Sequence, residues 1–261
     1  MISWTPRLVR PNLHGSVTRE LALKILEAER RSESVSFPNE AELSLQQGVS
    51  RTVIREAMKV LVDKGMVEMR PKAGTNSTPR SSWKLLDSDI LSWQAELAPD
   101  SELLLQLCEV RLAIEPTASG FAAVRATQEQ LDEIARRLMT REALPPNAPL
   151  ETVVDCDLSF FNAVIAASQN PLLINLNATI RAPFRTTLLY TFGSSTTMAL
   201  ELKAQKDLFR ALHKKDPVAA AKAAERAVGM VMLAVQETRD AQKGSSRRGS
   251  RATERVRKPS V

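Results

Sequence analysis

The chain has 261 residues, of which 43% are hydrophobic, and this length and composition favour two globular domains over one. No run approaches the about 20 apolar residues of a membrane span, the start MISWTPRLVR has no apolar signal-peptide core, and two cysteines give no disulfide framework. We therefore expect a cytoplasmic protein with no membrane partner. The net charge of +6 comes largely from residues 241–261, which hold seven Lys or Arg and one Glu. An argument for nucleic-acid binding must therefore rest on local patterns rather than on the total charge.

A helix-turn-helix pattern occupies the first part of the chain. The first predicted helix spans about residues 19–31. A second, short helix at 40–47 follows the capping pair Asn39 and Glu42, and Gly48 ends it. A short helix, a glycine turn and another helix form the helix-turn-helix arrangement.

The next predicted helix, at 50–64, has two chemically different faces. On a helical wheel its apolar residues share one arc, and they are Val53, Ile54, Ala57, Val60 and Leu61. The opposite face carries three cations and a hydroxyl. A serine at the N-cap and the free N–H groups of the first turn suit a phosphate. We therefore predict a DNA-recognition helix whose contact residues are Ser50, Arg51, Thr52, Arg55 and Lys59. The alternative is an ordinary amphipathic helix with a solvated charged face.

A basic hairpin is predicted directly after this helix. Gly65 ends the helix at the position after its cap, and residues 66–70 and 71–75 favour two short strands around a tight turn. Such a hairpin is a wing able to reach an adjacent groove of DNA. Helix, turn, helix and basic hairpin occur in the right order, which favours DNA binding over the amphipathic alternative. The predicted wing contacts are Arg70, Lys72, Gly74 and Thr75.

Residues 15–78 resemble the N-terminal domain of the GntR superfamily of bacterial winged-helix regulators. The stretch FPNEAELSLQQGVSRTVIREAMKVLVDKGMVEMRPKAGT carries the resemblance, with matches at Pro38, Glu40, Leu43, Gly48, Ser50, Arg51, Arg55, Glu56 and Gly65. The resemblance implies that Arg51 and Arg55 reach base edges or phosphates and that the wing tip enters the minor groove. Ala41 stands where some members carry a DNA-contacting arginine, so we expect that contact to be absent.

The remainder of the chain is predicted to be helical. Residues 79–100 form a linker, and its two tryptophans favour a short helix at 87–98 docked between the domains. From residue 101 onward six helices are expected in an all-α bundle, near 101–125, 128–143, 150–168, 171–192, 196–214 and 217–239. The polar, basic tail at 241–261 lacks periodicity and is predicted to be disordered. The predicted fold is thus mostly α, with a winged helix-turn-helix domain at 1–78, a linker at 79–100, a bundle at 101–240 and the tail.

The bundle resembles the FCD ligand-binding domain of the FadR branch of the same superfamily. The resemblance rests on RLAIE at 111–115, DLSF at 157–160, ASQN at 167–170 and AL at 211–212 with Asp216. The stretch RSSWKLLDSDILSW at 80–93 resembles members that sense sugar acids such as galactonate or gluconate. The resemblance implies a repressor that is released from double-stranded DNA by a small organic or sugar acid. Because a single winged domain makes too few base contacts for useful specificity, we expect a homodimer on a palindromic operator.

Many such domains bind a metal through one aspartate and three histidines. The aspartate falls on Asp157, but the histidine positions fall on Phe161, Gln205 and Ala227. The chain has only two histidines, so a three-histidine site cannot be built within it. We therefore expect neither a metal nor another cofactor.

Without a metal, an anionic effector needs another countercharge. Arg111 lies within an apolar run, and Arg181 and Arg185 lie one turn apart, so each offers a planar fork to a small carboxylate. Asp157 and Gln205 are the predicted partners of effector hydroxyl groups. The alternative is that Arg111 pairs with Glu115 or Asp157 and that Arg181 is solvated.

Two other functions remain open. An enzyme is disfavoured because the chain has no Walker A loop, no G-x-S-x-G, no Cys/His pair at a plausible site and few glycines. A metal-free regulator that senses acyl-CoA or another hydrophobic ligand is equally compatible with the missing histidines. The arginines favour a small acid.

Overall fold

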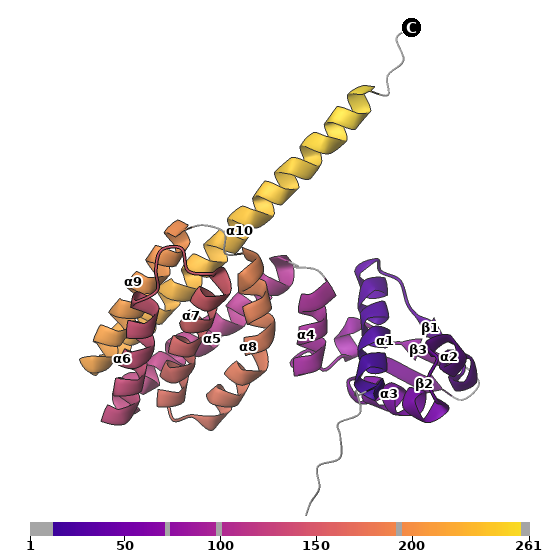
Figure 1. Ribbon diagram of the computed structural model, residues 1–261, viewed down its shortest axis with the longest axis horizontal. Coiled ribbons are helices and arrows are strands. Elements are labelled where there is room, and N and C mark those ends of the chain that lie inside the picture. Colours follow the sequence, from indigo (N-terminus) through magenta and orange to yellow (C-terminus); the bar gives the residue numbers. More distant parts are fainter. Residues whose placement is uncertain (1–12, 71–73, 98–100, 192–194, 257–261) are drawn as a thin grey trace, which may run out of the picture. The chain divides into compact units, whose positions relative to one another are not determined.

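The computed structural model describes residues 13–70, 74–97, 101–191 and 195–256. The chain divides into two compact units, Met1–Ala98 and Pro99–Val261. Figure 1 shows the elements of both units, which are mostly helices with one small sheet. Among the described residues, no helix is both long and apolar enough to cross a membrane.

The N-terminal unit contains the predicted helix-turn-helix. Its helices are α1 (Leu13–Arg30), α2 (Glu40–Gln47), α3 (Arg51–Asp63) and α4 (Ser88–Leu97), with a short 3-10 turn at Arg80–Ser82. The side chain of Asn39 caps α2 by accepting the backbone N–H groups of residues 41 and 42, both at 3.0 Å. Ser50 caps α3 by accepting the Val53 N–H at 3.4 Å. Gly48 has a φ of 63°, a left-handed conformation that glycine adopts without steric cost and that turns the chain between the two helices.

A three-stranded antiparallel sheet includes the predicted wing. The strands are β1 (Ser36–Phe37), β2 (Val67–Arg70) and β3 (Gly74–Ser77), in the order β1-β3-β2. The wing strands pair from Val67 opposite Ser77 to Arg70 opposite Gly74. The hairpin is confirmed, although its second strand is displaced toward the C-terminus from the predicted 71–75. Strand β1 was not predicted, because two residues are too few to show an alternating pattern.

The segment predicted to be a linker belongs to the N-terminal unit instead. Helix α4 packs against α1, and Trp83, Ile90 and Trp93 lie in the same buried cluster as Leu21 and Leu61. The predicted short helix is therefore present and packs on the winged domain, whose small core gains two large aromatic side chains from this segment.

The same segment is fastened to the end of the recognition helix. The buried Lys64 Nζ lies 2.7 Å from Asp87 Oδ1 and 2.8 Å from Asp89 Oδ2, and 5.5 Å from the centre of a Trp93 ring. Gly65 follows with a φ of 75°, and a Cβ at that position would lie 2.2 Å from the carbonyl oxygen of Ser82. Glycine is therefore required there both by its backbone conformation and by the close approach of the neighbouring chain.

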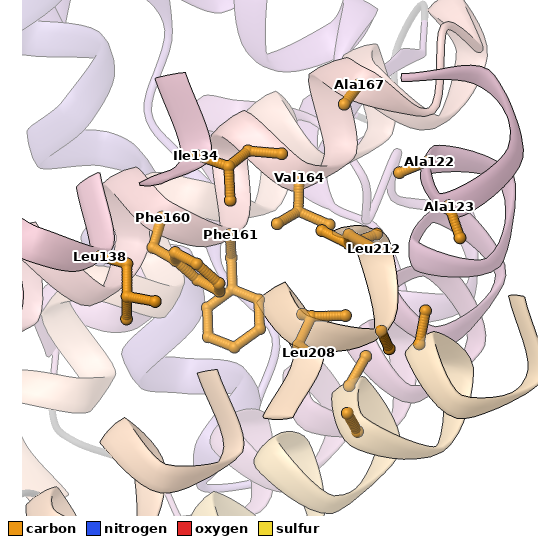
Figure 2. Packing of buried hydrophobic residues seen from close by; sticks show 14 of the residues in the cluster. Ala122, Ala123, Ile134, Leu138, Phe160, Phe161, Val164, Ala167, Leu208 and Leu212 are labelled. Atoms are coloured by element: carbon orange, nitrogen blue, oxygen red, sulfur yellow. The ribbon is translucent and has the colours of Figure 1, made fainter. Parts of the chain in front are cut away.

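Six helices form the described part of the C-terminal unit, as predicted. They are α5 (Ser101–Arg125), α6 (Gln128–Glu142), α7 (Leu150–Ala167), α8 (Pro171–Thr191), α9 (Ser195–His213) and α10 (Pro217–Val256). Small side chains, including Ala122, Ala220 and Ala224, are fully buried in the core and let α5 and α10 pack closely. Figure 2 shows the rings of Phe160 and Phe161 among the aliphatic side chains of this core, and their centroids are 5.4 Å apart in an edge-to-face arrangement.

The end of α10 corrects a second prediction. Residues 241–256 continue the helix rather than forming a disordered tail, and 257–261 lie outside the described residues. Extending an existing helix adds one backbone hydrogen bond for each residue without a new nucleation cost, and no proline interrupts the chain between Pro217 and Pro259. Figure 1 shows this end of α10 projecting beyond the other helices of its own unit.

Candidate nucleic-acid interface and buried polar cluster

The two faces of helix α3 lie as the sequence predicts. Ile54, Ala57, Met58 and Leu61 are buried in the core of the N-terminal unit. The opposite face is exposed to solvent and carries Arg51, Thr52, Arg55 and Lys59. The helix therefore presents a row of cationic side chains to solvent, and the packing of its buried face holds its backbone in place.

Two of these cations have weak partners on the surface. Arg55 Nη2 lies 3.1 Å from Glu40 Oε2, and Lys59 Nζ lies 2.8 Å from Glu56 Oε1. Both basic side chains are more than half exposed, at 61% and 62%, and surface ion pairs of this kind contribute little stability. Arg51 makes no hydrogen bond or ion pair with any residue that the structure describes. A phosphate or a base edge can therefore compete for all three groups at low cost.

The wing adds further polar groups. Arg70 is exposed and bonded to Glu68 on its own strand, at 3.1 Å from Nε to Oε2. Gly74 has a φ of 81° and opens β3, and Thr75 beside it is half-buried. Lys72 lies outside the described residues. The wing contacts thus remain a prediction, with Arg70 as the charged group that the structure places.

A cluster of buried polar side chains lies inside the C-terminal unit. At its centre is Asp157 on α7, which is 4% exposed. Its Oδ1 accepts hydrogen bonds from Arg141 Nε on α6 and from Gln205 Nε2 on α9, each at 2.7 Å. Burial raises the pKa of Asp157, and the Arg141 guanidinium opposes this rise. Three helices are thus tied together through one carboxylate oxygen.

A second buried ion pair lies beside it. Arg111 Nε is 2.5 Å from Glu115 Oε1, and Arg111 Nη2 is 3.1 Å from Glu115 Oε2. The guanidinium carbon lies 3.8 Å from the ring centre of Phe184 and 5.6 Å from that of Phe161. Stacking on aromatic faces stabilises a cation away from water, so Arg111 is fixed in position by both charge and shape.

Glu201 on α9 is the fifth charged residue of the cluster and has a different character. It is 3% exposed, and burial raises its pKa to about 8, an effect that the Asp157 charge increases and the guanidinium groups of Arg111 and Arg141 reduce. Its carboxyl group is therefore protonated at neutral pH. A neutral carboxylic acid both donates and accepts a hydrogen bond.

Three buried atoms of the cluster have no hydrogen-bond partner among the described residues: Arg111 Nη1, Glu201 Oε2 and Gln205 Oε1. Leaving a buried polar group unpaired costs about 1–3 kcal/mol, and such groups in native proteins point to a bound water, ion or ligand. Here they comprise a cationic donor, an acceptor and a carboxyl group. A small polar molecule with a negatively charged end offers partners of the kinds that these atoms lack.

The structure brings three of the five predicted effector residues into this cluster: Arg111, Asp157 and Gln205. The other two lie elsewhere on α8. Arg185 forms a two-pronged ion pair with the exposed Asp155, at 2.6 Å and 3.0 Å, and its side chain is 38% exposed. Arg181 is exposed on the same face and, after the larger effect of Arg185, helps to lower the pKa of Asp155. The alternative pairing of Arg111 with Glu115 is the one observed.

Sequence reasoning missed Arg141 and Glu201. Both carry a signal in their spacing. Arg141 continues the buried face of α6 seven residues after Ile134, and Glu201 precedes Gln205 by one helical turn. A charged residue at an apolar position of an amphipathic helix is therefore the pattern that would have found them.

A divalent cation does not fit at Asp157. Both groups that point at its Oδ1 are hydrogen-bond donors, and Phe161, Gln205 and Ala227 occupy the positions that the resemblance assigns to histidines. Within the described ranges no group of three or more His, Cys, Asp or Glu residues is arranged to hold a metal. That the protein works without a metal or other cofactor stays a prediction.

Comparison with known proteins agrees with this architecture. Residues 14–76 match the family of bacterial regulatory proteins called the gntR family, and residues 106–229 match the FCD domain. The galactonate operon transcriptional repressor of Escherichia coli is 35% identical over 192 residues, which cover 72% of this chain and 82% of that protein. The chain belongs to the GntR family. This GntR-family protein is also 30% identical over 214 residues to the HTH-type regulator YieP of Escherichia coli, covering 82% of this chain and 91% of YieP.

Solved structures support the fold alone. Lar, which controls the agr system of Listeria monocytogenes, matches with a TM-score of 0.57 at 16% identity over 88% of this chain and 99% of Lar. The family and its relatives make this GntR-family protein a ligand-responsive, DNA-binding transcriptional regulator with an FCD effector-binding domain. Its relatives are regulators rather than enzymes.

Proposed function

We propose that this GntR-family protein is a cytoplasmic repressor that binds a palindromic operator as a homodimer and is released from it by a small sugar acid. The effector binds in the buried polar cluster of the FCD domain. The observation that carries this proposal is the buried, stacked guanidinium of Arg111, whose Nη1 has no partner among the described residues. The galactonate operon repressor among the relatives supports a sugar acid as the effector class.

The DNA-binding half of the proposal rests on the exposed face of α3. In this proposal Arg51 and Arg55 reach base edges and Lys59 contacts a phosphate, which their exposure on one face of α3 supports. One recognition helix reads only a few base pairs, and two copies related by a two-fold axis read both halves of a palindrome. The dimeric state follows from this requirement for specificity.

The effector half of the proposal assigns the countercharge to Arg111. Glu115 already compensates most of its charge, so Arg111 contributes mainly a hydrogen-bond donor, Nη1, at the free edge of the guanidinium. An acyl-CoA or another hydrophobic ligand is less well supported, because an apolar chain would leave the three unpartnered polar atoms without hydrogen bonds.

The test combines DNA release with direct binding. Fluorescence anisotropy on DNA flanking the protein's own gene measures release by galactonate, and calorimetry measures galactonate binding, both in the presence of a chelator. We expect galactonate to bind and to release DNA, Arg111→Met to abolish both effects, and Arg185→Met to retain them. Arg185→Met is a matched control because it removes the same group from a surface ion pair. Loss of release in Arg185→Met with intact release in Arg111→Met would reverse the assignment, and stoichiometric metal in protein purified without chelator would refute the metal-free site.

A further inference from the structure

The charges of the buried cluster balance without Glu201. Arg111 is paired with Glu115, and Arg141 with Asp157. Glu201 has no cationic partner of its own within the described part of the chain, and its Oε2 has no hydrogen-bond partner there. A buried carboxylate without a cation is costly, so the group keeps its proton and acts as a hydrogen-bond donor.

The unpartnered atoms also differ in what they require. Arg111 Nη1 can only donate, Gln205 Oε1 can only accept, and the neutral carboxyl of Glu201 can do either. A carboxylate satisfies the first and third groups but offers no hydrogen to Gln205 Oε1. A ligand that satisfies all three must therefore carry a hydrogen-bond donor, such as a hydroxyl group, in addition to its carboxylate.

We infer that Glu201 is a ligand-binding residue, and that Arg111, Glu201 and Gln205 together select a carboxylate that also bears hydroxyl groups. Arg111 and Glu201 donate to the ligand's carboxylate oxygens, and Gln205 accepts from a hydroxyl. This inference rests on the proposed function, because it assumes that the effector enters this cluster. It adds the neutral acid as a recognition group and gives the reason for choosing a hydroxy acid over an alkyl acid.

An amino acid is the competing ligand, because it also carries a carboxylate and a hydrogen-bond donor. The ammonium group of an amino acid could form an ion pair with Glu201 only if the Glu201 carboxyl were ionised. Before the ligand binds, no nearby cation is left over to compensate an ionised Glu201. A hydroxyl group satisfies Gln205 without any change of charge. The lack of an ionised carboxylate for the ammonium group therefore favours the hydroxy acid, and the amino acid is an outcome of the test.

The experiment compares three ligands of the same chain length on the full-length protein by calorimetry: galactonate, hexanoate and norleucine. Each is titrated into the wild type, Glu201→Gln and Glu201→Leu, with the exposed Glu225→Gln as a matched control. Thermal melting checks that each variant is folded. Glutamine keeps a donor and an acceptor of the same shape, whereas leucine keeps only the volume.

We expect galactonate to bind the wild type and Glu225→Gln alike, and Glu201→Gln within about threefold of them. Glu201→Leu should bind it roughly 5- to 150-fold more weakly, the effect of leaving one buried hydrogen-bonding group unpaired. Hexanoate should bind the wild type more weakly by a similar factor, because it offers no donor to Gln205. Glu201→Leu should weaken hexanoate further, because Glu201 donates to the carboxylate that both ligands share.

Three results would overturn the inference by itself. Galactonate binding that is unchanged in Glu201→Leu would remove Glu201 from the site, while the proposed effector would stand. Equal affinity for hexanoate and galactonate would remove the hydroxyl requirement. Tightest binding of norleucine, lost in Glu201→Gln, would show an ionised Glu201 that pairs with an ammonium group. Failure of galactonate to bind any of the four proteins would instead refute the proposed effector class itself, and the inference with it.

Discussion

The stability of the FCD domain should depend on pH through Glu201. Burial raises the pKa of this carboxyl to about 8 from an ordinary value of 4.5. Below pH 4.5 the group is protonated in both the folded and the unfolded chain, so its favourable contribution is complete. As the pH rises, the unfolded chain loses the proton first, and stability falls until the folded group ionises near pH 8. The slope approaches about 1.4 kcal/mol per pH unit, or at most about 5 kcal/mol over this window. Glu201→Gln cannot ionise and should lack this dependence.

Urea unfolding between pH 5 and pH 8 measures the effect. Trp83 and Trp93 both lie in the N-terminal unit, so their fluorescence follows that unit, while far-UV circular dichroism follows mainly the helical FCD domain. We expect Glu201→Gln to match the wild type at pH 5 and to exceed it by several kcal/mol at pH 8 in the dichroism transition alone. Protein concentration is held constant, because association would shift the transition. Parallel stability curves for the wild type and Glu201→Gln across the window would refute the reasoning.

Three further predictions concern the rest of the chain. Arg51→Ala or Arg55→Ala should each reduce operator discrimination by about 1–3 kcal/mol, and two variants that footprint like the wild type would contradict the recognition-helix assignment. Truncation after Asp240 should lower sequence-independent DNA binding and its salt dependence but preserve operator preference. Loss of folding, or loss of dimerisation measured by light scattering, would show instead that the end of α10 is structural. Gly65→Ala should destabilise the N-terminal unit by more than the about 1–2 kcal/mol that alanine costs in a left-handed conformation, because its Cβ meets a backbone oxygen. The control Gly48→Ala should cost only that amount. Equal tryptophan-fluorescence unfolding transitions for the two variants would contradict the steric argument.

The sequence was sufficient for the DNA-binding elements because their signals are local. Asn39 and Ser50 are cap residues at the starts of two amphipathic helices, and each accepts a backbone N–H there. Gly48 and Gly65 lie where the chain needs a positive φ. Each signal depends only on neighbours within one or two turns, so periodicity and turn chemistry are enough to find it.

The segment after the wing and the buried cluster depend on residues far apart in the sequence. Two tryptophans indicated a packed segment but not which core they join, since that depends on contacts with α1. The partners of Asp157 come from helices α6 and α9, and Arg185 was expected beside Arg111 although it faces Asp155 at the surface. A one-dimensional pattern gives the face of a helix but not the neighbour that covers it, so ion-pair partners among six similar helices could not be predicted.

The chain that connects the FCD domain to the recognition helix passes through α4. The contacts of Lys64 determine whether effector binding can detach α4 from the end of α3. Its buried ammonium bonds Asp87 and Asp89, and Asp87 also caps α4 by accepting the N–H groups of Asp89 and Ile90, at 2.9 Å and 3.2 Å. The Lys64 side chain is 8% exposed, whereas those of Asp87 and Asp89 are 24% and 59% exposed. Withdrawing α4 would leave this cation without its partners, at a cost above the about 1–3 kcal/mol of an unpaired buried neutral group. Allosteric coupling energies are typically about 1–3 kcal/mol. An effector changes DNA affinity only through its different affinities for two states, and that difference is too small to separate α4 from α3. The energetics therefore favour a response in which α4 stays attached to the winged unit and the recognition helix keeps its shape.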